Sequence, residues 1–288
     1  MRTRIQPLFK WTGSKQRMLN LYEPYFFPKV EPTRFVDLFA GALTTTLWMA
    51  ETYPSCQLVI NDANKELILL YQTLAKNTTG VIDRWQECVN GWLKLTPEAR
   101  KPYYYKLRKG YCLAHQDKSA EYLSGMLLFM LSVNFNGIWK AYNICEKRYS
   151  TPPGTCTQGE KFFTTDNIHA VADVLRHADI HCGSYADVTL RDGDYVYADP
   201  PYRSSSVDYQ CNFEESNHVH LAKFLTTHNG PYAYSNKVIG DAFYITHFPA
   251  TQIHQVAATY TAGRGDAVSV DEVIITNFEP RRNATLFD

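Results

Sequence analysis

Short apolar runs that alternate with amphipathic segments are the feature that most constrains the fold of this chain. Residues 35–39 and 57–60 are mostly apolar and are bounded by turn or polar residues, as expected of buried strands. Helices are expected between the two runs at 44–51 and after them at 64–76. Apolar side chains in the second helix repeat at helical spacing, namely Leu67, Leu70, Tyr71 and Leu74. This order predicts an α/β fold with a mixed, mostly parallel sheet.

A different pattern interrupts this alternation. Between about 81 and 131 the periodicity is helical, and an Asn-Gly turn signal at 136–137 then stands between aromatic residues, as in a β-hairpin. Strand-like runs return further along the chain, at 195–198, 232–234 and 273–275. We therefore expect one α/β domain made of residues 1–77 and 164–288, with a helical insertion at 78–163 that carries the hairpin.

Composition restricts the classes of function. The chain has 29 basic and 29 acidic residues, so its net charge is zero. Between Arg100 and Ser150, however, nine Lys and Arg face three Asp and Glu, with aromatic residues interleaved. This distribution suits a polyanion, although a solvated helix surface would have a similar composition.

Other features concern location and metals. The N-terminus lacks the apolar core of a signal peptide, and the longest strongly apolar run, Met126 to Leu131, is too short to span a bilayer. The seven cysteines form no CxxC pair, and the nine histidines form no HxH or HExxH pattern. We therefore expect a cytoplasmic protein that binds neither a metal nor a membrane, with a monomer as the default state.

The tetrapeptide Asp199-Pro-Pro-Tyr202 carries the strongest chemical signal. It directly follows the run 195–198, and open α/β sheets bind ligands at the carboxyl ends of their strands. Two consecutive prolines fix the backbone and remove two N–H donors, so that carbonyl groups can face a ligand. A carboxylate, rigid carbonyls and an aromatic ring together suit an extruded base with an exocyclic amino group. A proline-rich turn with a helix-capping aspartate is the alternative.

This tetrapeptide resembles the (D/N/S)PP(Y/F/W) motif of amino-methyltransferases, whose Asp form is typical of adenine-N6 enzymes that act on DNA. Further segments resemble the same family, namely Phe9-Lys-Trp-Thr-Gly-Ser-Lys15, Val36-Asp-Leu-Phe-Ala-Gly41, Ile60-Asn-Asp-Ala-Asn64, Tyr234-Ser-Asn236 and Val270-Asp-Glu-Val273. Their order is that of the alpha group, which includes the bacterial and phage DNA adenine methyltransferases. The resemblance covers nearly the whole chain. It implies a Rossmann-like methyltransferase fold, S-adenosyl-L-methionine as cofactor and double-stranded DNA as substrate, in a bacterial or phage-infected cell.

The resemblance also implies which residues bind the cofactor. They are Trp11, Lys15, Phe39, Gly41, Asp62, Ser184, Tyr185 and Asp199. Physical arguments support some of these roles. An acidic side chain at the end of the second strand, here Asp62, can bond ribose hydroxyls, or it can cap the following helix instead. Lys15 ends a flexible turn and suits the cofactor's carboxylate.

Two further points concern the walls of the implied cofactor site. Gly41 lets the backbone approach the cofactor, whereas the family usually has a second glycine where this chain has Leu43. Tyr185 and Phe39 are implied to pack on opposite faces of the cofactor's adenine, although core packing is the alternative for both rings.

The insertion resembles the target-recognition region of the family, whose hairpin enters DNA. The residues implied in DNA binding are Lys10, Phe135, Asn136, Gly137, Ile138, Trp139, Lys140, Asn143 and Arg148. An aromatic residue at the tip can wedge between base pairs, and Asn and Lys can read base edges. A hairpin packed on the helices for structural reasons is the alternative. Thr155 and Cys156 stand where GATC-specific relatives carry a basic residue, so the target sequence is not carried over.

Together these features predict a site-specific methyltransferase that acts on N6 of a flipped adenine, with Asp199, Pro200 and Tyr202 as the catalytic residues. Asp199 and the Pro200 carbonyl would accept hydrogen bonds from the amino group, while Tyr202 would hold the base. Cytosine-N4 or RNA-adenine transfer and a catalytically silent DNA-binding module stay open. A protein-glutamine methyltransferase would more typically have Asn at 199. A nicotinamide oxidoreductase is disfavoured because the first loop lacks GxGxxG.

Overall fold

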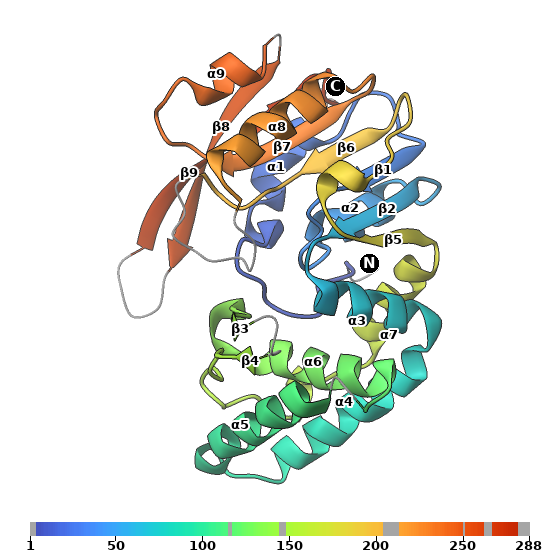
Figure 1. The fold of residues 1–288 in the computed structure, drawn as a ribbon, viewed down its shortest axis with the longest axis vertical. Helices are drawn as coiled ribbons and strands as arrows, with labels where there is room; N and C mark the ends of the chain where they lie inside the picture. Colours follow the sequence, from blue (N-terminus) through green and yellow to red (C-terminus); the bar gives the residue numbers. More distant parts are fainter. Residues whose placement is uncertain are drawn as a thin grey trace, which may run out of the picture.

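The computed structural model describes residues 4–114, 117–143, 148–203, 213–249, 251–261 and 267–281. Within these residues, seven strands form one sheet in the order β5-β2-β1-β6-β7-β9-β8 (Figure 1). The strands are β1 (Arg34–Asp37), β2 (Gln57–Asp62), β5 (Ala178–Cys182), β6 (Tyr195–Ala198), β7 (Tyr232–Lys237), β8 (Gln252–Thr261) and β9 (Ala267–Thr276). The first five strands of this order, β5, β2, β1, β6 and β7, run parallel to one another. Strand β9 is antiparallel to β7, and β8 is antiparallel to β9. The predicted α/β fold with a mixed, mostly parallel sheet is confirmed.

Helices connect and cover these strands. In the described part of the chain they are α1 (Leu19–Phe26), α2 (Thr44–Thr52), α3 (Lys65–Lys76), α4 (Thr78–Leu93), α5 (Pro97–Ala114), α6 (Ala120–Val133), α7 (Asp166–Arg176), α8 (Glu215–Thr226) and α9 (Phe243–His247). The expected helices at 44–51 and 64–76 therefore form within one residue of the predicted ends. Among the described helices, none combines the length and the apolar character needed to cross a membrane.

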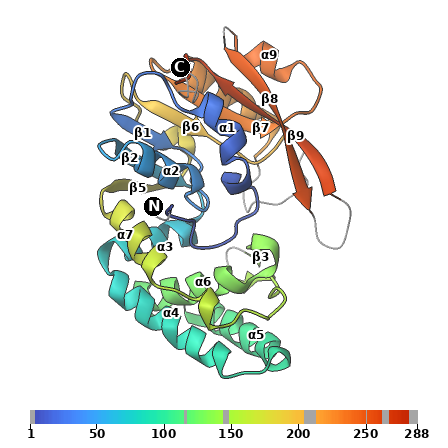
Figure 2. The same ribbon diagram turned by 180° about the vertical axis from the view of Figure 1, so that it is seen from behind.

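Successive side chains of the central strands enter two different cores. Phe35 and Tyr195 pack with α1 and α2 on one face of the sheet. Val36 and Val196 pack with α8 and α9 on the other face. Figures 1 and 2 show these helices on opposite sides of the sheet. Because both faces are covered, strands β1 and β6 are buried at every residue, which explains the apolar and aromatic residues at their centres.

The helices of the insertion extend the core of the α/β part. Side chains of α3, such as Leu70, share one hydrophobic cluster with α4, α5 and α6, to which Trp92, Tyr104 and Phe129 contribute. Helix α6 is enclosed by α3, α4 and α5, so it is apolar on nearly all sides. The insertion is therefore continuous with the core beneath the sheet, as Figure 1 shows at the bottom of the molecule.

The hairpin of the insertion lies later in the chain than predicted. Asn136 and Gly137 have positive φ angles of 52° and 71°, as an Asn-Gly pair favours, but they belong to a 3₁₀ turn at Phe135–Gly137. Asn134 forms its bridge with Pro153, so the residues beside this turn do not pair with each other. The strands that do pair are β3 (Ala141–Asn143) and β4 (Arg148–Tyr149).

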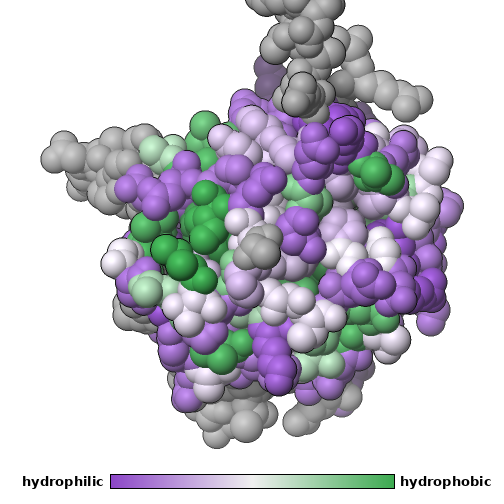
Figure 3. Space-filling model, turned by 90° about the horizontal axis from the view of Figure 1, so that it is seen from above, coloured by the Kyte–Doolittle hydropathy of each residue, from purple (hydrophilic) through white to green (hydrophobic). Residues whose placement is uncertain are grey.

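The surface seen from above in Figure 3 is mixed. Hydrophobic side chains form small groups between hydrophilic ones on this face. Exposed large hydrophobic side chains are also scattered along the chain, for example Val30 and Ile245 at 79% and 75% exposure. Scattered exposure of this kind is ordinary and does not mark a binding surface.

Candidate active site

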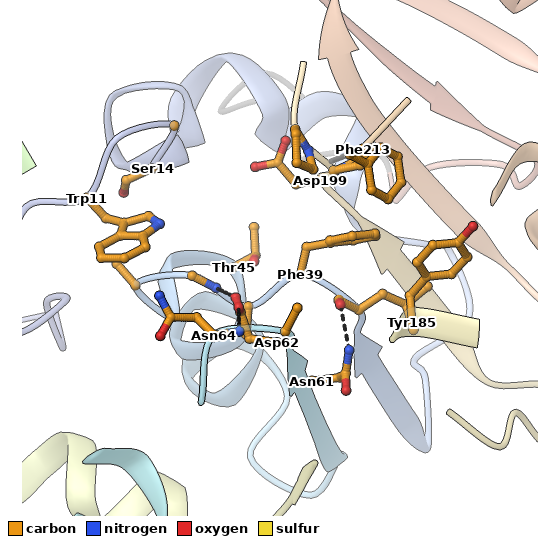
Figure 4. Close-up of a pocket in the computed structure, with 18 of the residues that line it drawn as sticks. Trp11, Ser14, Phe39, Thr45, Asn61, Asp62, Asn64, Tyr185, Asp199 and Phe213 are labelled. Carbon is orange, nitrogen blue, oxygen red and sulfur yellow. Dashed lines mark hydrogen bonds between the residues drawn. The ribbon is translucent and has the colours of Figure 1, made fainter. Parts of the chain in front are cut away.

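A cavity of about 770 Å³ lies at the carboxyl ends of β1, β2 and β6. Every residue that the sequence implied in cofactor binding lines it, namely Trp11, Lys15, Phe39, Gly41, Asp62, Ser184, Tyr185 and Asp199. Pro200 and Tyr202 line it too. Figure 4 shows Asp62 and Asp199 on facing sides, with Trp11 toward one end and Phe39 and Tyr185 toward the other. The fold thus brings the implied catalytic and cofactor residues into one cavity, where open α/β sheets bind ligands.

The loop after β1 has a left-handed backbone at two positions. Gly41 has φ 47°, and a Cβ there would lie 3.2 Å from the Trp11 ring, so both conformation and space favour glycine. Leu43 has φ 65° and is 2% exposed. Left-handed backbone costs a non-glycine residue about 1–2 kcal/mol, which burial of the leucine side chain offsets by about 1.5–3 kcal/mol. The loop therefore keeps a glycine-like path in spite of the substitution.

Asp62 faces the cavity from the end of β2. Its Oδ2 accepts a hydrogen bond from the Gly41 N–H at 2.9 Å and its Oδ1 accepts one from the Asn64 N–H at 2.8 Å. Burial raises the pKa of Asp62 above its ordinary value, although both backbone N–H groups act to lower it. The cap of α3 is Asn64, whose Oδ1 accepts from the N–H groups of Glu66 and Leu67 at 3.0 and 3.2 Å. Asp62 is therefore not the helix cap, and its remaining lone pairs can accept from a ligand.

Lys15 is bound to the aspartate of the tetrapeptide. Lys15 is 2% exposed, and its Nζ lies 2.7 and 2.6 Å from Oδ1 and Oδ2 of Asp199. Burial alone would lower the pKa of Lys15, but the Coulomb attraction of Asp199 and Glu272 raises it above its ordinary value. Asp199 thus already compensates the charge of Lys15, and the role of Lys15 toward the cofactor's carboxylate stays a prediction.

Asp199 has a second partner in the cavity wall. The Ser235 hydroxyl in β7 donates to Asp199 Oδ1 at 2.9 Å. Burial raises the pKa of Asp199, while Lys15 and Ser235 act to lower it. The side chain keeps 16% of its surface exposed, so the carboxylate is oriented without being sealed off.

Glu272 in β9 is a candidate functional residue that the sequence analysis did not single out within the segment 270–273. It is fully buried and accepts hydrogen bonds from the Tyr22 hydroxyl at 2.5 Å and from the Tyr202 hydroxyl. The Tyr202 ring also lies over Lys15, with Nζ 5.0 Å from the ring centroid. The resemblance of the segment 270–273 was the only signal for Glu272, and it gave no role.

The aromatic end of the cavity differs from the expectation. The rings of Phe39 and Tyr185 contact each other, with centroids 5.5 Å apart. A base stacked between two rings needs roughly 7 Å, twice the carbon contact distance of about 3.5 Å. The two rings therefore do not pack on opposite faces of one adenine in this arrangement. They form one wall with Phe213, whose centroid lies 5.7 Å from Phe39 and 5.9 Å from Tyr185. No local pattern in the sequence had pointed to Phe213.

The residues implied in DNA binding divide into three groups. Those that are exposed are Lys10, Phe135, Asn136, Ile138 and Lys140. Gly137 and Trp139 are buried against the protein, so the expectation that they face DNA is corrected. The side chains of Asn143 and Arg148 lie outside the described part of the structure.

Some of the excess Arg and Lys residues in the insertion make hydrogen bonds within the protein and are not available to DNA. Arg100 is 8% exposed and donates to carbonyl oxygens of three residues, namely Trp92, Cys156 and Gln158. Arg108 donates to the Thr151 carbonyl at 2.6 Å. Lysines on α5 are exposed, namely Lys101, Lys106 and Lys109. Within the described residues, no group of three or more His, Cys, Asp or Glu side chains could hold a metal ion.

Comparison with known proteins agrees with this geometry. The model of the D12 class of N6 adenine-specific DNA methyltransferases matches residues 11–262. The type II methyltransferase M.MjaIII of Methanocaldococcus jannaschii is 25% identical over 236 residues, which are 76% of this chain and 79% of that protein. The type II methyltransferase M1.LlaDCHI of Lactococcus lactis subsp. cremoris is 28% identical over 211 residues, 69% and 66% of the two chains. The Retron Ec67 DNA adenine methylase of Escherichia coli is 25% identical over 233 residues, 77% and 72% of the two chains.

Proposed function

Since this chain belongs to the D12 class of N6 adenine-specific DNA methyltransferases, we propose that its methyl donor is S-adenosyl-L-methionine and that the donor binds in the cavity of about 770 Å³. Small-molecule sites occupy roughly 300–1,000 Å³. The cavity is therefore large enough for the donor with an extruded base beside it. The observation that carries the proposal is that Asp62, Asp199, Pro200 and Tyr202 line the same cavity.

The residues present fit this donor. The Asp62 carboxylate, fixed by two backbone N–H groups, is placed to accept hydrogen bonds from ribose hydroxyls. The wall of Phe39, Tyr185 and Phe213 offers aromatic surface to an adenine ring. Gly41 allows close approach of the backbone. When bound, the donor supplies a methyl group on a sulfonium, which a nitrogen nucleophile can attack directly.

Asp199 then acts on the target adenine. Its Oδ1 accepts from both Lys15 and Ser235, whereas its Oδ2 accepts from Lys15 and keeps a second lone pair for the N6 amino group. The Pro200 carbonyl accepts the second N6 hydrogen. These hydrogen bonds raise the electron density on N6 and fix its direction of attack. N6 gives up one proton as the new bond forms, and Asp199, which is partly exposed, receives it and passes it to water.

Tyr202 presents its ring to the extruded base. Its hydroxyl is held by the buried Glu272, which fixes where the ring lies. Extruding a base costs a few kcal/mol, and a rigid aromatic surface offsets part of that cost by stacking. Lys15 and Glu272 thus act through Asp199 and Tyr202 as positioning residues.

The insertion at 78–163 would recognise double-stranded DNA. Figures 1 and 2 show the hairpin of β3 and β4 on the same side of the molecule as the extended ends of β8 and β9. Exposed residues of 135–140 and Lys10 are brought together there, since the Thr12 N–H donates to the Gly137 carbonyl at 3.2 Å. Phe135 is the candidate wedge, and Asn136 and Lys140 are candidates for base contacts.

The proposal is tested with Asp199→Asn, which keeps the shape of the side chain and removes its charge. We expect methyl incorporation into duplex DNA to fall by at least about 100-fold, the usual effect of removing a catalytic proton acceptor. Binding of S-adenosylhomocysteine should persist, because Asp62 and the aromatic wall are unchanged. The matched control is Asp173→Asn on the exposed face of α7. Nucleoside analysis of the product should show N6-methyladenine; an active Asp199→Asn variant would overturn the assignment.

A further inference from the structure

Glu66 is a buried carboxylate that joins the cavity to the insertion. It lies in the first turn of α3, is 7% exposed and lines the cavity. Its Oε2 accepts a hydrogen bond from Trp139 Nε1 at 3.3 Å, and its Oε1 accepts one from the Tyr149 hydroxyl. Both donors belong to the insertion, one just before β3 and the other in β4. The proposed methyl transfer itself does not use Glu66.

Aromatic rings enclose this carboxylate. Trp139 and Tyr149 are stacked with centroids 4.7 Å apart, and Tyr111 of α5 contacts both at 6.0 and 5.5 Å. A buried carboxylate is costly unless it is hydrogen-bonded, and hydrogen bonds to a charged group are stronger than those between neutral groups. Trp139 is therefore held in place by Glu66. Its chain neighbours Ile138 and Lys140 are exposed, so Glu66 also sets their position.

A chain of hydrogen bonds links Glu66 to the loop after β1. The Gly41 N–H donates to Asp62 at 2.9 Å, and the Asn64 N–H donates to the same carboxylate at 2.8 Å. The Glu66 N–H in turn donates to the Asn64 side chain at 3.0 Å. All four residues line the cavity. A ligand that bonds to Asp62 therefore acts on the same helix turn that holds Trp139.

The segment around Trp139 is held from a second side. The Thr12 N–H donates to the Gly137 carbonyl at 3.2 Å, and a Cβ at Gly137 would lie 2.6 Å from the backbone of Lys10. Trp11, between those two N-terminal residues, lines the cavity. Residues 137–139 are thus fixed by cavity residues through two separate sets of contacts.

From these contacts we propose that Glu66 is a positioning residue that couples the donor cavity to the recognition segment 135–140. Donor binding stiffens the turn that carries Glu66, and this places the exposed side chains of the segment for DNA. Because coupling between two sites is reciprocal, DNA must strengthen donor binding by the same factor. This inference rests on the proposed function, since it takes the cavity as the donor site.

The test measures the affinity for a fluorescent DNA duplex with and without S-adenosylhomocysteine, which cannot transfer a methyl group. The duplex contains the adenine site found by modification-sensitive sequencing of DNA treated with the enzyme. We expect S-adenosylhomocysteine to tighten DNA binding by wild-type protein by between about 5-fold and 150-fold. Glu66→Gln should reduce this factor to about 2-fold or less, because the amide lacks the charge and one of the two acceptors. Glu87→Gln on α4, 66% exposed, should keep the wild-type factor.

Tyr149→Phe tests the coupling between donor and DNA binding without changing a residue of the donor cavity or a buried charge. It removes the hydroxyl that Glu66 accepts from, and Tyr149 is not among the residues that line the cavity. We expect it to reduce the coupling factor while the affinity for S-adenosylhomocysteine alone stays unchanged. Combined with Glu66→Gln, its effect should be less than additive, since both changes break one contact.

The outcomes distinguish the two proposals. If S-adenosylhomocysteine does not bind the wild-type protein, the proposed function fails. If it binds but leaves DNA affinity unchanged, or if Glu66→Gln and Tyr149→Phe both keep the wild-type factor, the coupling role of Glu66 is overturned while the donor site stands. Should circular dichroism show that Glu66→Gln is unfolded, the result for Tyr149→Phe decides.

Discussion

Replacing Asp199 by alanine should lower the stability of the protein as well as its activity, because it strands a buried cation. The side chains of Lys15 and Asp199 are 2% and 16% exposed and lie 2.6 Å apart. Removing one partner of a buried ion pair costs about 3–5 kcal/mol. Glu272 still attracts Lys15 in the variant, so we expect the lower end, about 3 kcal/mol. For a chain of 288 residues that is a fall in Tm of roughly 5 °C.

A double variant isolates the cause. Asp199→Ala combined with Lys15→Met removes both charges and fills the Lys15 site with an apolar chain of similar length. Its free energy of unfolding should lie closer to wild type than that of the single variant, because no buried cation is left without Asp199. Methyl transfer should stay absent, since the acceptor for the N6 hydrogens is still missing.

The assay is urea unfolding followed by circular dichroism at pH 7.5, with tritiated methyl incorporation measured on the same samples. Two results would refute the reasoning. In one, Asp199→Ala is as stable as wild type, which would mean that Lys15 does not depend on Asp199. In the other, the double variant is as unstable as the single one, which would place the cost elsewhere.

Three further outcomes follow from the structure. Burial raises the pKa of Asp37 from 3.8 to about 7. The native state then holds a proton on Asp37 that the unfolded chain releases at lower pH. The contribution of Asp37 to the free energy of unfolding is therefore full below pH 3.8 and falls by up to about 4 kcal/mol as the pH rises through 7. Asp37→Asn should flatten this pH dependence of stability, measured by urea unfolding between pH 5 and 8. Lys140→Ala should weaken DNA binding and reduce its salt dependence by about one counterion, whereas Lys223→Ala on α8 should not; equal salt slopes in binding titrations would contradict this. Leu43→Gly should relieve the strain of the left-handed backbone but lose a buried side chain, so we expect a net destabilisation of about 1 kcal/mol by urea unfolding. A more stable variant would show that the backbone strain exceeds the stabilisation from burying the leucine.

The parts of the fold that the sequence predicted are those with a strong local pattern. The central strands have both faces covered, so they are rich in apolar and aromatic residues around Val36 and Val196. The edge strand β5 was not predicted, because most of its residues are half-buried or exposed and its sequence, Ala178-Asp-Ile-His-Cys182, has no apolar run. The edge strand β8 was not predicted either.

In the site, too, the residues that the sequence predicted are those that belong to a local pattern. Asp199 to Tyr202 and Asp62 were identified because each belongs to a short motif at the end of a strand. The pairing of Lys15 with Asp199 spans 184 residues, and that of Tyr202 with Glu272 spans 70. No local pattern encodes such contacts, which arise only when the sheet is assembled. Likewise, the sequence does not tell which of two neighbours, Ile138 or Trp139, turns inward.

The hydrophobic cluster that α3 shares with α4, α5 and α6 limits how this enzyme can change its target. Excising 78–163 as a block would leave the apolar face of α3 in water, and a foreign block would have to match that face side chain by side chain. We therefore expect a change of target to be easier through the exposed residues of 135–140 than through the helices beneath them, whose side chains belong to the shared core.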